Sequence, residues 1–148
     1  MFITEFKFGT TIQVVYVDLL CLSKMETQKK ITFLSSDMPS VELSEARIKF
    51  MEQTKKTLFG KASNPTFEVN GAKIDYIVPD GSLADITVKC YLALDEADVY
   101  IKAQPTISFD VKTPKSDYEK TIADLLCQLE KYVEGDRAQG TLNLEEKE

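Results

Sequence analysis

The strict alternation of apolar and polar residues over positions 84–94 constrains the fold of this chain most. Apolar residues occupy every second position of this run, and Asp85, Thr87 and Lys89 stand between them. Successive side chains of a β-strand point to opposite faces. The run therefore predicts a long antiparallel strand with one buried face and one solvated face.

Similar alternation, or enrichment in β-branched residues, predicts further strands over 2–8, 11–22, 31–34, 67–69, 72–78, 99–101 and 107–111. Asn70-Gly71 separates two of these runs, and this dipeptide favours the type I′ turn of a tight hairpin. The sequence therefore predicts a hairpin centred on Asn70-Gly71. A second turn is predicted at Pro79-Asp80-Gly81.

Two amphipathic helices are predicted. The first follows the breaker cluster 35–40 and ends before Gly60, with its apolar stripe at Leu43, Ala46, Phe50, Thr54 and Leu58. The second opens on the capping box Ser116-Asp117-Tyr118-Glu119 and ends at Gly135. Its stripe consists of Tyr118, Ile122, Leu125, Leu129 and Tyr132, with Leu126 and Val133 beside it, and is expected to be core rather than an oligomer seam.

The resulting order, β-β-β-α-β-β-β-β-β-α, predicts an α+β fold. We expect a single domain over 1–135, in which a mainly antiparallel sheet of seven to eight strands carries two helices on one face. Residues 136–148 form a polar, acidic tail. Within it, 141–144 is either a short edge strand or simply part of the tail.

Composition excludes several classes of function. The 148 residues contain no His, which removes Ser-His-Asp and Cys-His catalysis and imidazole zinc ligands. Cys21, Cys90 and Cys127 form no Cys-x-x-Cys pair, so we expect three buried thiols in a reducing compartment. A net charge of -6 without a basic block makes nucleic-acid binding a poor expectation. We also find no signal peptide and no apolar run long enough to span a membrane, and therefore expect a cytoplasmic protein that is not secreted.

One constellation suggests metal-dependent chemistry. Asp75 (or Asp80) and Asp110 lie on or beside predicted strands, and two carboxylates on neighbouring strands can hold a hard divalent cation. Lys112 follows Asp110 by two positions and so shares its face, where an ammonium group can position an attacking water. Gln128 and Tyr132 share one face of the second helix.

These residues resemble the PD-(D/E)XK nuclease superfamily, in particular its members with a Gln-x-x-x-Tyr helix. The resemblance covers at most residues 42–144, and Asp110 stands where Glu is commoner. It implies Mg²⁺ or Mn²⁺ at Asp75 and Asp110, a catalytic Lys112, and contacts of Gln128 and Tyr132 with the phosphate strand. A helix carrying Glu45 or Glu52 would precede the strands, and 141–144 would form the last one.

Two weaker features remain. Asp95, Glu96 and Asp98 could bind Ca²⁺ or Mg²⁺, although a solvated turn explains them better. Phe2, Phe6 and Phe8 could stack single-stranded bases, although they equally fit the core face of a strand.

The leading hypothesis is non-enzymatic and requires no cofactor, because no competent catalytic set stands out. The chain is expected to be a small bacterial or phage accessory or assembly protein, found in the virion or host cytoplasm if phage-encoded. It would bind another protein or itself, as a homo-oligomer, through a sheet edge or a helix face. A metal-dependent nuclease is the alternative, and a single-stranded nucleic-acid binder is the third hypothesis.

Overall fold

The computed structural model describes residues 1–18, 20, 29–59, 66–78, 80–94 and 99–135. The strands are β1 (Phe2–Phe8), β2 (Ile12–Val17), β3 (Ile31–Ser35), β4 (Thr66–Tyr76), β5 (Leu83–Leu94), β6 (Val99–Ala103) and β7 (Thr106–Asp110), and the helices are α1 (Val41–Phe59) and α2 (Asp117–Val133). All described strand pairs are antiparallel. The α+β fold class is therefore confirmed.

The strands form one sheet in the order β3-β2-β1-β4-β5-β6. The first half of β5 pairs with β7 and the second half with β6, so these two short strands follow one another along the same side of β5. Pro105 lies between them, and its carbonyl accepts a hydrogen bond from the Val88 N–H. Because proline cannot donate to a ladder, an outer position beside β5 suits it.

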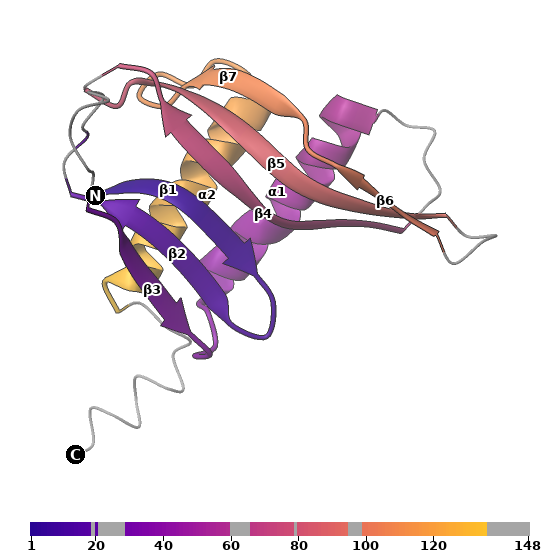
Figure 1. Ribbon diagram of the computed structural model, residues 1–148, viewed down its shortest axis with the longest axis horizontal. Coiled ribbons are helices and arrows are strands. Elements are labelled where there is room, and N and C mark those ends of the chain that lie inside the picture. The colour runs from indigo at the N-terminus through magenta and orange to yellow at the C-terminus, as the bar shows by residue number, and fades with distance from the viewer. Residues whose placement is uncertain (19, 21–28, 60–65, 79, 95–98, 136–148) are drawn as a thin grey trace.

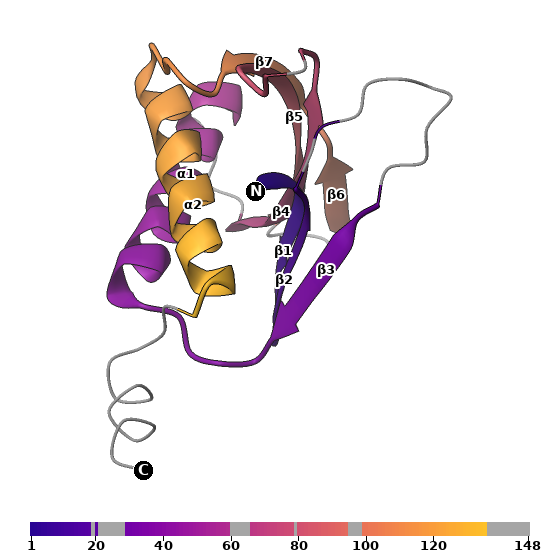
Figure 2. The same ribbon diagram turned by 90° about the vertical axis from the view of Figure 1, so that its left-hand side faces the viewer.

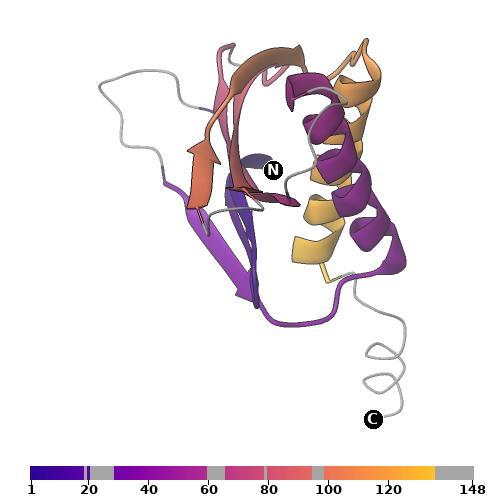
Figure 3. The same cartoon turned by 90° about the vertical axis from the view of Figure 1, so that its right-hand side faces the viewer.

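Both helices cover the same face of the sheet and pack against each other (Figures 1, 2 and 3). The core lies between the two layers. It takes the alternate residues of β5 (Ala84, Ile86, Val88 and Cys90) and, from the predicted helix stripes, Leu43, Ala46 and Phe50 of α1 and Tyr118, Ile122, Leu125, Leu129 and Tyr132 of α2. The other face of the sheet, which we call the polar face, carries Glu5, Lys7, Lys73, Asp75, Thr87 and Lys89 among others.

The predicted hairpin at Asn70-Gly71 is wrong. β4 runs without interruption through both residues, and a β-bulge shifts its register with β5 between Val69 and Gly71. A Cβ atom on Gly71 would lie 2.1 Å from the Phe6 carbonyl oxygen on β1. The glycine is thus required for the close approach of two strands. Permitting such an approach is a second structural use of glycine in β-structure, besides its use in turns.

The second strand is also shorter than predicted. β2 ends at Val17, and neither Asp18 nor Leu20 is in a strand. Asp18 is exposed, and the ladder with β3 already ends at Tyr16. The described residues that directly follow Val17 therefore pair with no strand, although the sequence just after Val17 is mostly apolar.

Both helices agree with the sequence prediction. The Ser40 hydroxyl accepts from the Leu43 N–H at the start of α1, and the Ser116 hydroxyl accepts from the Glu119 N–H at the start of α2. The Glu119 carboxylate accepts from the Lys115 N–H, one residue before the cap. Gly135 follows α2 with a φ of 118°, as expected of a C-terminal glycine.

The burial of the cysteines differs from the prediction, which expected all three thiols to be buried. Cys90 is buried, but Cys127 is exposed on α2, because it lies on the side of the helix away from the core stripe. Cys21, the acidic cluster Asp95, Glu96 and Asp98, and the tail 136–148 with its segment 141–144 lie outside the described residues. No described helix is long and apolar enough to cross a membrane.

Candidate functional site

The two predicted metal-binding carboxylates do not lie on neighbouring strands. Asp75 on β4 pairs with Asp85 on β5, and Asp110 on β7 pairs with Leu83 on the other side of β5. Because adjacent strands are about 4.8 Å apart, the backbones of Asp75 and Asp110 are separated by roughly 10 Å across the sheet. In the described part of the chain, no group of three His, Cys, Asp or Glu side chains could hold a metal ion.

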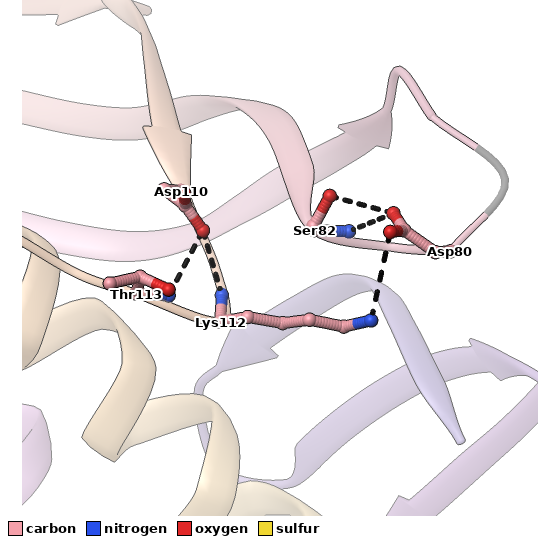
Figure 4. Close-up of polar contacts among 5 residues, drawn as sticks. All are labelled: Asp80, Ser82, Asp110, Lys112 and Thr113. Atoms are coloured by element: carbon pink, nitrogen blue, oxygen red, sulfur yellow. Dashed lines mark hydrogen bonds and ion pairs between the residues drawn. The ribbon is translucent and has the colours of Figure 1, made fainter.

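The Asp110-Val111-Lys112 triplet forms a turn at the end of β7 (Figure 4). The Asp110 Oδ1 accepts from the N–H groups of Lys112 and Thr113 at 3.1 and 3.0 Å. The Lys112 ammonium lies 3.9 Å from the Asp80 carboxylate, on an exposed surface. Hydrogen bonds from Ser82 lower the pKa of Asp80. The polar atoms of the triplet thus stabilise local turns.

The predicted helix pair Gln128 and Tyr132 belongs to α2, which covers the apolar face of the sheet. Tyr132 is 1% exposed, and its hydroxyl donates to the Asp37 carbonyl at 2.6 Å. Asp75 lies among the exposed residues of the opposite face. The structure does not bring Gln128 and Tyr132 together with Asp75 around one site, and Asp80 faces Lys112 rather than another carboxylate.

The aromatic residues of β1 pack against other side chains of the protein. Phe6 and Phe8 are buried, and the Phe6 ring lies 6.0 Å from that of Phe50 on α1. Phe2 contacts the Tyr76 ring edge-on at 5.6 Å. Stacked bases need exposed ring faces, and Phe6 and Phe8 offer none.

A groove lies between α1 and the β1–β2 hairpin, on the helix side of the sheet. Its volume is about 260 Å³, and its lining consists of Phe8, Ile12, Pro39, Leu43, Ser44, Arg47, Ile48 and Met51. We call it the α1 groove. Six of its eight lining residues are apolar.

The rim of the α1 groove is unusually apolar for an exposed surface. Ile48 is 50% exposed, and Val41 and Met38, at the start of α1 and just before it, are 70% and 69% exposed. Val41, Ser44, Ile48 and Met51 follow each other at helical spacing and form a second stripe on α1, beside the core stripe. The sequence pattern predicts a single apolar face for this helix, so the second stripe is not expected from it.

Arg47 is the one charged side chain of the lining. Its guanidinium lies over the Phe8 ring, 4.5 Å from the centroid. Partial burial lowers the Arg47 pKa, and the more distant charge of Glu68 raises it. No carboxylate of the described residues forms an ion pair with Arg47. The groove therefore combines apolar surface with a cation that forms no ion pair with a carboxylate of the described residues.

The chain matches no protein-family model, no curated protein and no solved structure. A function for the chain is therefore inferred from its geometry alone.

Proposed function

We propose that this protein is a non-enzymatic binding or assembly subunit that captures a partner protein in the α1 groove. The observation that carries the proposal is the exposed second stripe of α1 beside an arginine without a carboxylate partner in the described structure. Exposed apolar side chains that gather around a groove are a common mark of protein-binding surfaces. The helix-face contact expected from the sequence was the stripe of the second helix, which is buried, whereas the surface proposed here lies on α1.

The chemistry of the groove defines the partner segment. Ile12, Leu43 and Met51 offer an apolar floor of a size suited to a leucine-like side chain. Arg47 favours a carboxylate next to that side chain, because the planar guanidinium pairs with carboxylates in two-point geometry. The occupant is therefore a short segment of another protein in which a large apolar residue stands beside Asp or Glu.

This proposal is tested with a fluorescent peptide that carries two leucines, each followed by a glutamate. Binding to the full chain is measured by fluorescence anisotropy. The Arg47→Gln variant is expected to weaken binding about fivefold, which corresponds to roughly 1 kcal/mol for a partly exposed ion pair. Ile48→Glu is expected to abolish binding, because it places a repelling charge on the apolar rim.

Lys49→Gln is the matched control, since Lys49 lies on the same helix but outside the groove lining. An equal loss of peptide affinity in Arg47→Gln and Lys49→Gln would contradict the proposal, because it would show only the effect of net charge. Sedimentation of the unliganded protein adds a second arm. An oligomer that Ile48→Glu dissociates would make a second copy the occupant and would replace the partner proposed here.

A further inference from the structure

The polar face of the sheet contains a hollow at the position where the sequence suggested a hairpin. Four residues lie on one rung across four strands: Gln13 pairs with Lys7, Lys7 with Gly71, and Gly71 with Lys89. The position between the two lysines therefore carries no side chain. The hollow measures about 430 Å³, and its lining consists of Lys7, Phe8, Gly9, Thr10, Thr11, Gln13, Asn70 and Lys89.

The positive charge at this rung exceeds the negative charge. The ammonium groups of Lys7 and Lys89 lie 3.4 and 3.3 Å from the same carboxylate oxygen of Glu5. Two lysines thus flank one carboxylate, which leaves a local charge of about +1 in a chain of net charge -6.

The remaining lining supplies polar groups that can donate hydrogen bonds. The side chains of Thr10, Thr11, Gln13 and Asn70 have no hydrogen-bond partner within the described residues. Asn70 stands at the bulge of β4, and Thr10 and Thr11 belong to the loop between β1 and β2. Bulges often redirect a side chain beside a binding site. Hydroxyl and amide groups of this kind, together with two ammonium groups, can surround a small anion on several sides.

We propose that this hollow binds the phosphate group of a small phosphorylated molecule. Phosphate is favoured over carboxylate because lysine acts as a compact point charge, and a tetrahedral dianion accepts hydrogen bonds in several directions. The volume of the hollow lies within the range of small-molecule sites, so it has room for more than the phosphate itself. The proposal is independent of the α1 groove, which lies on the helix side of the sheet.

The test is a titration of the ¹⁵N-labelled full chain with inorganic phosphate, with chloride used to hold the ionic strength constant. Saturable shifts are expected at the backbone amides of Gly9, Asn70 and Gly71. Lys7→Gln is expected to raise the dissociation constant about fivefold, because one of two charge-assisted contacts is lost. The Lys7 side chain is 50% exposed, so this variant is expected to fold. Lys89→Gln provides a second variant at the same rung.

The Glu5→Gln variant distinguishes phosphate binding by the two lysines from a purely structural role of their ion pairs with Glu5. Removing the carboxylate frees both ammonium groups for the ligand, so phosphate is expected to bind at least about threefold more tightly. Lys112→Gln is the matched lysine control, since Lys112 lies outside the hollow lining. The dissociation constant of phosphate for this variant should equal that of the wild type.

Three results would overturn the proposal. Shifts that chloride alone reproduces would show general ion screening. Equal weakening by Lys7→Gln and Lys112→Gln would show an effect of net charge only. A single-stranded oligonucleotide that shifts the same amides at lower concentration, with a steep loss of affinity in salt, would reassign the hollow to nucleic acid.

Discussion

Gly71 shows how one residue type can have two structural meanings. After an asparagine, a glycine favours a turn with positive φ. Here the only positive-φ glycines described are Gly81 and Gly135, and Gly71 instead permits the contact between β1 and β4. The sequence could not distinguish the two uses, because the strand that approaches Gly71 is more than sixty positions away.

Replacing Gly71 by alanine tests this role. The added Cβ would lie 2.1 Å from the Phe6 oxygen, and a backbone atom cannot move aside cheaply. We expect Gly71→Ala to lower the free energy of unfolding by about 3 kcal/mol or more, measured by urea denaturation. Gly9→Ala is the control, because its nearest contact would be the Thr11 oxygen at 3.8 Å. Similar losses in both variants would refute the close-approach explanation.

Glu5 predicts a pH dependence of stability. Burial raises its pKa, but the hydrogen bond and charge of Lys89, followed by those of Lys7, outweigh this effect and lower the pKa below 4.5. A carboxyl group whose pKa is lower in the folded than in the unfolded state stabilises the fold at pH values above its unfolded pKa. That stabilisation is lost as the pH falls through the folded pKa.

The wild type is therefore expected to be more stable than Glu5→Gln at neutral pH, and this difference should shrink as the solution is acidified below the unfolded pKa. Denaturant titrations over a series of pH values measure it. Glu52→Gln is the control, since Glu52 is exposed on α1 and forms no ion pair within the described residues. A difference between the wild type and Glu5→Gln that stayed constant across the pH series would contradict the assigned ion pairs.

At the scale of the element, the helices were the most predictable part of the fold. Their stripes and capping residues are local signals, since each depends on residues three or four positions apart. The core stripe also explains why Thr54 is buried: its hydroxyl donates to the Phe50 carbonyl and shares a hydrogen bond of 2.8 Å with the Tyr118 hydroxyl. This contact joins α1 to α2.

Removing the Tyr118 hydroxyl should weaken the junction of the two helices. Burial raises the pKa of Tyr118 to about 12, with a smaller opposing effect of the Thr54 hydrogen bond. Tyr118→Phe is expected to cost about 1–2 kcal/mol, because the buried hydroxyl of Thr54 loses one of its two hydrogen-bond partners. Tyr16→Phe is the control, since the Tyr16 hydroxyl has no hydrogen-bond partner in the described part of the chain. Equal thermal shifts in the two variants would contradict the role assigned to this contact.

At the scale of the whole molecule, strand order could not be predicted from the sequence. Alternation shows which face of a strand is buried, but it does not show which strand lies beside it. The pairing of β1 with β4 joins residues more than sixty positions apart, and β7 returns past β6 to pair with the first half of β5. The same limit applies to function: Asp75 and Asp110 seemed to form a pair until β5 was placed between them.

Both proposed sites depend on this long-range arrangement. The α1 groove joins a helix to a hairpin that precedes it by about thirty positions, and the hollow joins four strands, of which Gly71 lets β1 and β4 approach closely. The individual residues were visible in the sequence. Neither Lys7 nor Arg47 belongs to a local sequence motif, so no local pattern indicates a role for either residue.

The most direct test of the central claim uses the methionine methyl groups as reporters of position. Met51 lines the α1 groove and Met38 directly precedes Pro39 of the lining, whereas Met1 borders a different hollow near α2. The protein is labelled with [¹³C-methyl]methionine and titrated with the leucine–glutamate peptide, and resonances are assigned from Met→Leu variants. We predict saturable shifts of Met51 and Met38 with Met1 unchanged, and loss of these shifts in Ile48→Glu. Peptide binding that shifts Met1 and leaves Met51 unchanged would contradict the account.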